Sequence, residues 1–71
     1  MTKNSLKIER RLQAANIPLN GVAIRNSSVE ILREEGDTDQ VAELVMQTLG
    51  WAGVKESWGG WVVTEPRGVA I

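Results

Sequence analysis

The chain has 71 residues and a mass of 7.8 kDa, so we expect a single domain, residues 1–71, in which folding hides about 60% of the surface. Apolar residues make up 42%, charged residues 24%, and the net charge is −1, a profile typical of a globular domain. There is no Cys and no His, which excludes disulfides, thiolate or imidazole metal sites and His- or Cys-dependent nucleophilic triads. No apolar run is long enough to span a bilayer and the N-terminal residues do not read as a secretory signal, so we expect a cytoplasmic protein.

Residues 5–16 predict an amphipathic helix. On a helical wheel Ile8, Leu12 and Ala15 gather on one side. A separate basic stripe is formed by Lys3, Lys7, Arg10 and Arg11. Asn4 or Ser5 is expected to cap the start of the helix, and Pro18 is expected to end it.

Residues 21–25 and 29–34 are rich in β-branched side chains and predict two short strands. The polar segment 26–28 between them suits a tight hairpin turn. Alternation places Val22 with Ile24 on one face of the first strand and Val29 with Ile31 on one face of the second. Leu32 falls on the opposite face.

Residues 38–49 predict a second helix. Asp37 and Gln40 resemble a capping box at its start, and Gly50 stands where a left-handed residue commonly ends a helix. Apolar side chains cover about 200° of this helix, whereas one that packs on a sheet needs about 100°. The excess apolar surface therefore has to be covered, either within the chain or by a second subunit.

Residues 54–58 and 61–65 predict a second hairpin, with Gly59 and Gly60 in a type I′ turn. This register places Trp58 opposite Trp61, and Glu56 opposite Val63. Val54, Trp58 and Trp61 would then share the inner face of the sheet. Because alternation is imperfect, one large apolar group is expected to be exposed at the hairpin tip. Residues 66–71 are expected to form a tail.

A shift of 32 residues aligns the two halves of the chain, and each half reads as helix, strand, strand. Two such units can join their hairpins into one sheet, which gives the three or more strands that stability requires. The sequence therefore predicts an α+β fold, an αββαββ two-layer sandwich with a four-stranded antiparallel sheet and both helices on one face.

The apolar second helix and the tryptophans indicate a contact surface for another protein or for a second copy, most simply in a homodimer. The candidate interface residues are Val41, Leu44, Val45, Met46, Trp51, Trp58 and Trp61. The competing interpretation is that the first helix, Trp51 and the tail cover these side chains and that two of the three tryptophans belong to the core.

The basic stripe offers an alternative function, in which Lys3, Lys7, Arg10 and Arg11 contact nucleic acid or an acidic partner. A solvated charged face explains the same residues. The acidic residues Glu34, Glu35, Asp37 and Asp39 lack the spacing of a calcium loop, and a strand end and a helix cap account for them. We expect no metal, no cofactor, no membrane partner and no catalytic residue.

Residues 14–24, Ala-Ala-Asn-Ile-Pro-Leu-Asn-Gly-Val-Ala-Ile, are similar to segments of short phage- or prophage-encoded proteins. The resemblance implies a phage accessory protein that inhibits a host system, as anti-CRISPR proteins do, and it assigns no role to any residue. The sequence thus predicts a small non-enzymatic protein-interaction module, with a nucleic-acid-binding accessory protein as the alternative.

Overall fold

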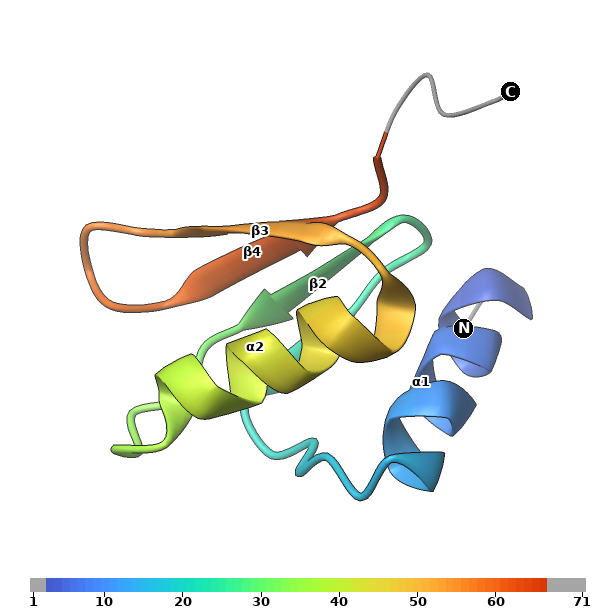
Figure 1. The fold of residues 1–71 in the computed structure, drawn as a ribbon, viewed down its shortest axis with the longest axis horizontal. Coiled ribbons are helices and arrows are strands. Elements are labelled where there is room, and N and C mark those ends of the chain that lie inside the picture. The colour runs from blue at the N-terminus through green and yellow to red at the C-terminus, as the bar shows by residue number, and fades with distance from the viewer. Residues whose placement is uncertain (1–2, 67–71) are drawn as a thin grey trace.

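Two helix–strand–strand units follow each other along the chain in the computed structural model, which describes residues 3–66 and, at residue 3, the backbone alone. Figure 1 shows the six elements and their arrangement. In chain order they are α1 (Lys3–Ala14), β1 (Val22–Ile24), β2 (Ser28–Ile31), α2 (Thr38–Leu49), β3 (Ala52–Lys55) and β4 (Trp61–Thr64). The predicted α+β class and the αββαββ order are confirmed.

The four strands form one antiparallel sheet in the order β1-β2-β4-β3. Each hairpin contributes its second strand to the centre, where Val29 pairs with Val63 and Ile31 pairs with Trp61. The two units therefore form the single four-stranded sheet that the sequence predicted, and the structure shows that β2 and β4 join them.

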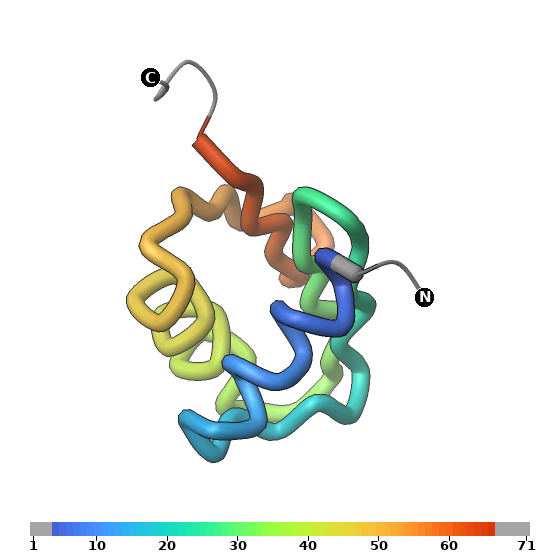
Figure 2. Tube along the Cα trace, turned by 90° about the vertical axis from the view of Figure 1, so that its right-hand side faces the viewer, coloured from blue at the N-terminus to red at the C-terminus, as the bar shows by residue number. Residues whose placement is uncertain are grey.

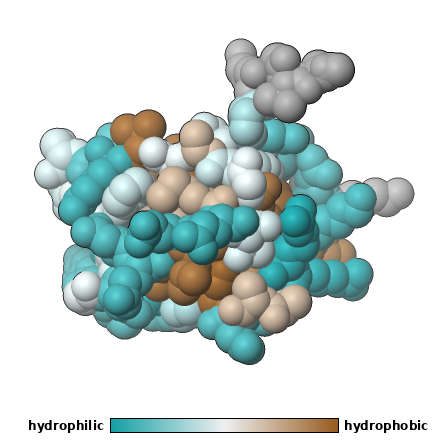
Figure 3. Space-filling model, in the orientation of Figure 1, coloured by the Kyte–Doolittle hydropathy of each residue, from teal (hydrophilic) through white to brown (hydrophobic). Residues whose placement is uncertain are grey.

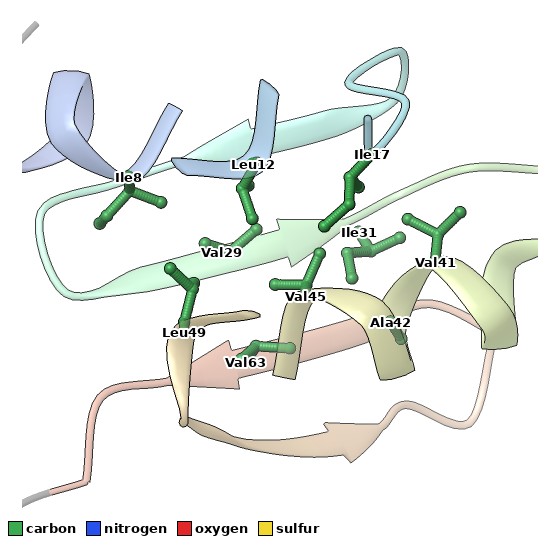
Figure 4. Close-up of a cluster of buried hydrophobic side chains, with 10 residues drawn as sticks. All are labelled: Ile8, Leu12, Ile17, Val29, Ile31, Val41, Ala42, Val45, Leu49 and Val63. Carbon is green, nitrogen blue, oxygen red and sulfur yellow. The ribbon is translucent and has the colours of Figure 1, made fainter. Parts of the chain in front are cut away.

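Both helices lie on the same face of the sheet, here called the inner face (Figure 2). Alternation turns Val29, Ile31 and Val63 toward the helices. Figure 4 shows these side chains meeting those of α1 and α2. The buried core consists of Ile8, Leu12, Ile17, Val29, Ile31, Val41, Ala42, Val45, Leu49 and Val63.

Helix α1 differs from its prediction at both ends. It already contains Lys3, so Asn4 and Ser5 lie inside the helix and do not cap it. It ends at Ala14, two residues early, because Asn16 takes a left-handed conformation with φ of 59° and the Ile17 N–H donates to the Leu12 carbonyl. Pro18 follows this stop rather than causing it.

Helix α2 spans the predicted residues, and Gly50 ends it in the left-handed conformation expected. The predicted capping box at its start is wrong, because Asp37 makes no side-chain cap hydrogen bond. The Asp37 carboxylate instead accepts a hydrogen bond from Arg33.

Strand β2 also ends earlier than predicted, at Ile31 rather than at residue 34. Arg33 is turned inward at this point, with its side chain only 2% exposed. Its guanidinium donates to Asn20 and Glu35 as well as to Asp37, which fixes the loop from β2 to α2. Its Nε has no hydrogen-bond partner among the described residues.

The predicted register of the second hairpin is wrong. Lys55 pairs with Trp61, so residues 56–60 form a five-residue loop instead of a two-glycine turn. Gly59 has a positive φ of 101° but Gly60 does not, which excludes the type I′ turn. Trp61 stays on the inner face as expected, whereas Val54 faces away from the helices. Residues 67–71, most of the predicted tail, lie outside the described part of the chain.

Candidate functional site

The face of the sheet turned away from the helices, here called the outer face, has no second layer over it among residues 3–66. Its strand positions are Ala23, Ser28, Glu30, Ala52, Val54, Val62 and Thr64. Val54 is 67% exposed, and Leu32, just beyond β2 on the same face, is 46% exposed. At the β1 edge, Arg25 and Glu30 form an ion pair. The outer face thus presents β-branched and aliphatic side chains to solvent.

Trp58 lies at the end of this face and is 61% exposed. Its ring packs directly on Gly60, where an added Cβ would overlap the ring carbons. Trp61 faces inward, so the adjacent Gly60 faces outward, and the Trp58 ring therefore covers the outer side of the sheet. Only a glycine leaves room for this packing, which holds one side of the ring against the backbone and leaves the rest open to solvent.

A hollow of about 380 Å³ opens beside Trp58, between the loop that leaves β2 and the loop that enters β4. These loops are neighbours because Ile31 and Trp61 pair in the antiparallel centre of the sheet. We call this feature the acidic hollow, and its lining consists of Leu32, Arg33, Glu34, Glu35, Gly36, Thr38, Asp39, Trp58 and Gly59. Leu32 and Trp58 belong to both features, so the hollow continues the outer face.

Asp39 stands where the acidic hollow meets the inner face. Its carboxylate accepts hydrogen bonds from Trp61 Nε1 at 3.0 Å and from Lys55 Nζ at 3.2 Å. The hydrogen bond from Trp61, and after it the one from Lys55, lowers the pKa of Asp39 below its ordinary value of 3.8. Asp39 is therefore ionised throughout the neutral range.

The predicted interface residues do not form one surface. Val41 and Val45 are buried in the core of this chain, and Met46, Trp51 and Trp61 are partly buried against it. Of the predicted interface residues on α2, only Leu44 is substantially exposed, at 46%. The excess apolar surface of α2 is thus covered mainly from within, by α1, Ile17 and the sheet. Trp58 is the exposed aromatic group expected at a hairpin tip.

The residues of the basic stripe on α1 differ in their contacts, because among the described side chains only Arg11 bonds to another element. Lys7 and Arg10 are exposed, and their side chains make no hydrogen bond or ion pair among the described residues. Arg11 instead donates to the Thr48 carbonyl at 3.1 Å, which places a cation at the C-terminal end of α2. Lys7 and Arg11 also border a second hollow of about 180 Å³, together with Trp51 and Glu65. The side chain of Lys3 lies outside the described part.

Comparison of the chain with protein-family models, with curated proteins and with solved structures finds no significant match. Within residues 3–66 there is no helix long and apolar enough to cross a membrane, and no group of three or more potential metal ligands. The function therefore has to be argued from the outer face and the acidic hollow themselves.

Sequence reasoning missed Leu32 and Val54 as surface residues and did not bring Glu34 and Trp58 together. The signal was present for Leu32, because alternation from the buried Ile31 already places it on the open face. Val54 was assigned to the inner face because the glycine pair suggested a shorter loop, whereas for Trp58 the sequence left both core and contact surface open.

Proposed function

We propose that this chain is a non-enzymatic protein-interaction module that binds a short segment of another protein across its outer face, with Trp58 as the anchor. The observation that carries the proposal is the exposure of Trp58, held against Gly60 beside the exposed Val54 and Leu32. Tryptophan is the residue most enriched among those that dominate binding energy at interfaces. A ring fixed on the backbone loses little further freedom when a partner covers it.

A segment of another protein is favoured over a second copy by the size of the outer face. Four strands of three or four residues give the sheet a flat area of roughly 260 Å², from the rise per residue and the spacing between strands. A standard stable interface buries about 800 Å² on each partner. Two sheets packed face to face would therefore fall short, whereas a segment that also enters the acidic hollow gains further contact.

The test is selection of binders from a displayed library of random peptides on the immobilised protein. Each enriched peptide is then measured against Val54→Gln and Trp58→Ala, which remove apolar surface from the outer face. Leu44→Gln is the matched control, because Leu44 is a comparably exposed apolar residue on α2. Circular dichroism melting verifies that all three variants remain folded.

We expect enriched peptides whose binding is lost in Trp58→Ala, weakened in Val54→Gln and retained in Leu44→Gln. Light scattering at increasing protein concentration tests self-association, and a dimer that Val54→Gln dissociates would keep the outer face as the contact surface but show that its occupant is a second copy. Peptide binding or a dimer that depends on Leu44 instead would overturn the outer face as the contact surface. A monomer that enriches no peptide would overturn the proposal.

Occupation of a contact site on a larger protein machine would make such a module an inhibitor, the role that the resemblance of residues 14–24 implies. The deciding measurement would be the activity of that machine with the wild type and with Trp58→Ala.

Nucleic-acid binding stays the second candidate because Lys7 and Arg10 are exposed and unpaired among the described residues. Phosphate contacts make affinity fall steeply with ionic strength. Fluorescence anisotropy with labelled DNA and RNA over a salt series tests this function, with Lys7→Gln and Arg10→Gln as variants. The absence of affinity at low salt would end it.

A further inference from the structure

The acidic hollow carries a net negative charge, because the carboxylates around it outnumber the cations that pair with them. The loop from β2 and the first turn of α2 carry four carboxylates, of which Glu34, Glu35 and Asp39 line the hollow and Asp37 is adjacent to them in the chain. Two cations face them, since Arg33 pairs with Glu35 and Asp37 and Lys55 pairs with Asp39. Glu34 is exposed and has no partner among the described residues. A ligand that enters the hollow is therefore favoured if it brings positive charge.

The carboxylates do not converge on a point. No group of three or more potential metal ligands is present in residues 3–66, so a small inorganic cation would not be enclosed. The hollow, at about 380 Å³, instead has room for an organic side chain. The open surface of the Trp58 ring forms one wall, and the unpaired Glu34 belongs to the loop on the opposite side.

An aromatic ring and a free carboxylate on two sides of one hollow match the guanidinium group. Arginine stacks its planar head and stem on tryptophan and donates two parallel hydrogen bonds to a carboxylate. Lysine has a compact, strongly hydrated ammonium group that uses this pairing less well. The chemistry thus favours arginine over lysine, and both over a neutral side chain of the same shape.

We propose that the acidic hollow is a recognition site for an arginine side chain of a partner protein, stacked on Trp58 and paired with Glu34. This inference rests on the proposed function, because the arginine belongs to the segment that crosses the outer face. Leu32 and Trp58 border both surfaces, so the apolar part of the segment would lie on the sheet and its arginine would enter the hollow. The partner is therefore recognised by an arginine beside apolar residues.

The site can be tested with a single residue as probe, so that no partner has to be known. N-acetylarginine methylamide is titrated into the labelled protein and followed by NMR at the Trp58 indole N–H and the backbone amides of Glu34, Gly36 and Gly59. The corresponding citrulline derivative has nearly the same shape without the charge, and the lysine derivative keeps the charge without the planar head. Trp58→Phe assigns the indole signal.

We expect weak saturable binding in the order arginine, lysine, citrulline, with shifts confined to the hollow. Glu34→Gln and Trp58→Leu should each weaken arginine binding about two- to fivefold, since exposed ion pairs and cation–π contacts have strengths of this order. Glu43→Gln is the matched control, because Glu43 is an exposed carboxylate on α2. Added salt should weaken the binding of arginine more than that of citrulline.

Equal binding of the arginine and citrulline derivatives, or equal loss in Glu34→Gln and Glu43→Gln, would overturn the arginine site. Other outcomes test the arginine site and the proposed function separately. Peptides that need Trp58 and Val54 but carry no arginine would retain the interaction module and overturn the site. Arginine binding in the hollow without any peptide that needs Val54 would support the site and overturn the module. Oligomers that Glu34→Gln dissociates would show that a second copy, not another protein, supplies the arginine.

Discussion

The two faces of the sheet are built from the same strands and from similar residues, yet they differ in what those residues do. On the inner face Val29, Ile31 and Val63 are fully buried under the helices. On the outer face the β-branched Val54 is largely exposed, with Val62 half-buried beside it. Residue type alone therefore does not separate core from contact surface in this chain. The side to which alternation turns each residue does.

The largest expected difference is between two adjacent residues on opposite faces. Ile31→Ala should lower the free energy of unfolding by about 2–5 kcal/mol, because it leaves a cavity in the centre of the core. Leu32→Ala should lower it by less than about 1 kcal/mol, because Leu32 is already 46% exposed. Urea denaturation measures both, and similar losses would refute the contrast between the faces.

The two tryptophans of the second hairpin repeat this contrast. Trp61→Ala should cost about 3 kcal/mol, because Trp61 packs against the core and hydrogen-bonds Asp39. Trp58→Ala should cost about 1 kcal/mol, because Trp58 is already 61% exposed and its ring packs on the loop backbone at Gly60. The comparison is read from urea midpoints. A greater loss from Trp58→Ala would make Trp58 a structural residue and remove it as an anchor.

A third contrast concerns how closely α2 approaches the inner face. A Cβ at Gly53 would stand 2.7 Å from Met46 Sδ and 3.1 Å from Val63 Cγ2, so Gly53→Ala should destabilise by about 1–3 kcal/mol. Gly36→Ala is the control, because an added Cβ there meets nothing within 4 Å. It should be neutral or stabilising by about 0.4–1 kcal/mol. Thermal melting separates the two, and equal melting temperatures would show that α2 does not pack as described.

The smallest expected effect is on how the free energy of unfolding depends on pH, and it comes from Asp39 at the end of the inner face. Hydrogen bonds from Trp61 and Lys55 lower the pKa of Asp39 in the folded chain below 3.8. The stability that this ionised group contributes is present above the unfolded value and is lost as pH falls through the lower, folded value. Asp39→Asn should therefore flatten the acid side of the stability curve, measured by urea midpoints from neutral pH downward. Glu43→Gln serves as the control, and an acid limb unchanged in Asp39→Asn would contradict the assignment.

Much of the architecture could be predicted from the sequence, because local patterns and global packing agree there. The spacing of Ile8 and Leu12 and the alternation of Val29 and Ile31 each predicted an element that the structure contains, although with different ends. For α2, with Gly50 at its end, the predicted bounds are those of the structure. The internal similarity of the two halves was enough to predict a single sheet with helices on one side.

The outer face and the acidic hollow could not be assembled from the sequence, because both depend on long-range contacts. A pair of glycines suggested a tight turn, but the packing of the Trp58 ring leaves no room for a Cβ at Gly60, and this requires a glycine there. The carboxylates near Asp37 suggested a helix cap, whereas the inward turn of Arg33 takes up Glu35 and Asp37. In both places a specific side-chain contact within the loop, which residue type and spacing do not reveal, accompanies the local conformation.

The central pairing of β2 with β4 has a consequence for how the chain reaches its native state. The last described strand completes the middle of the sheet rather than its edge, so Val29 and Ile31 are not enclosed until Val63 arrives. Because closing that long loop precedes the gain from burying the core, we expect the pairing of β2 with β4 to limit the rate of folding. Each hairpin by itself is only marginally stable, so removal of either should unfold the remainder rather than leave a smaller domain.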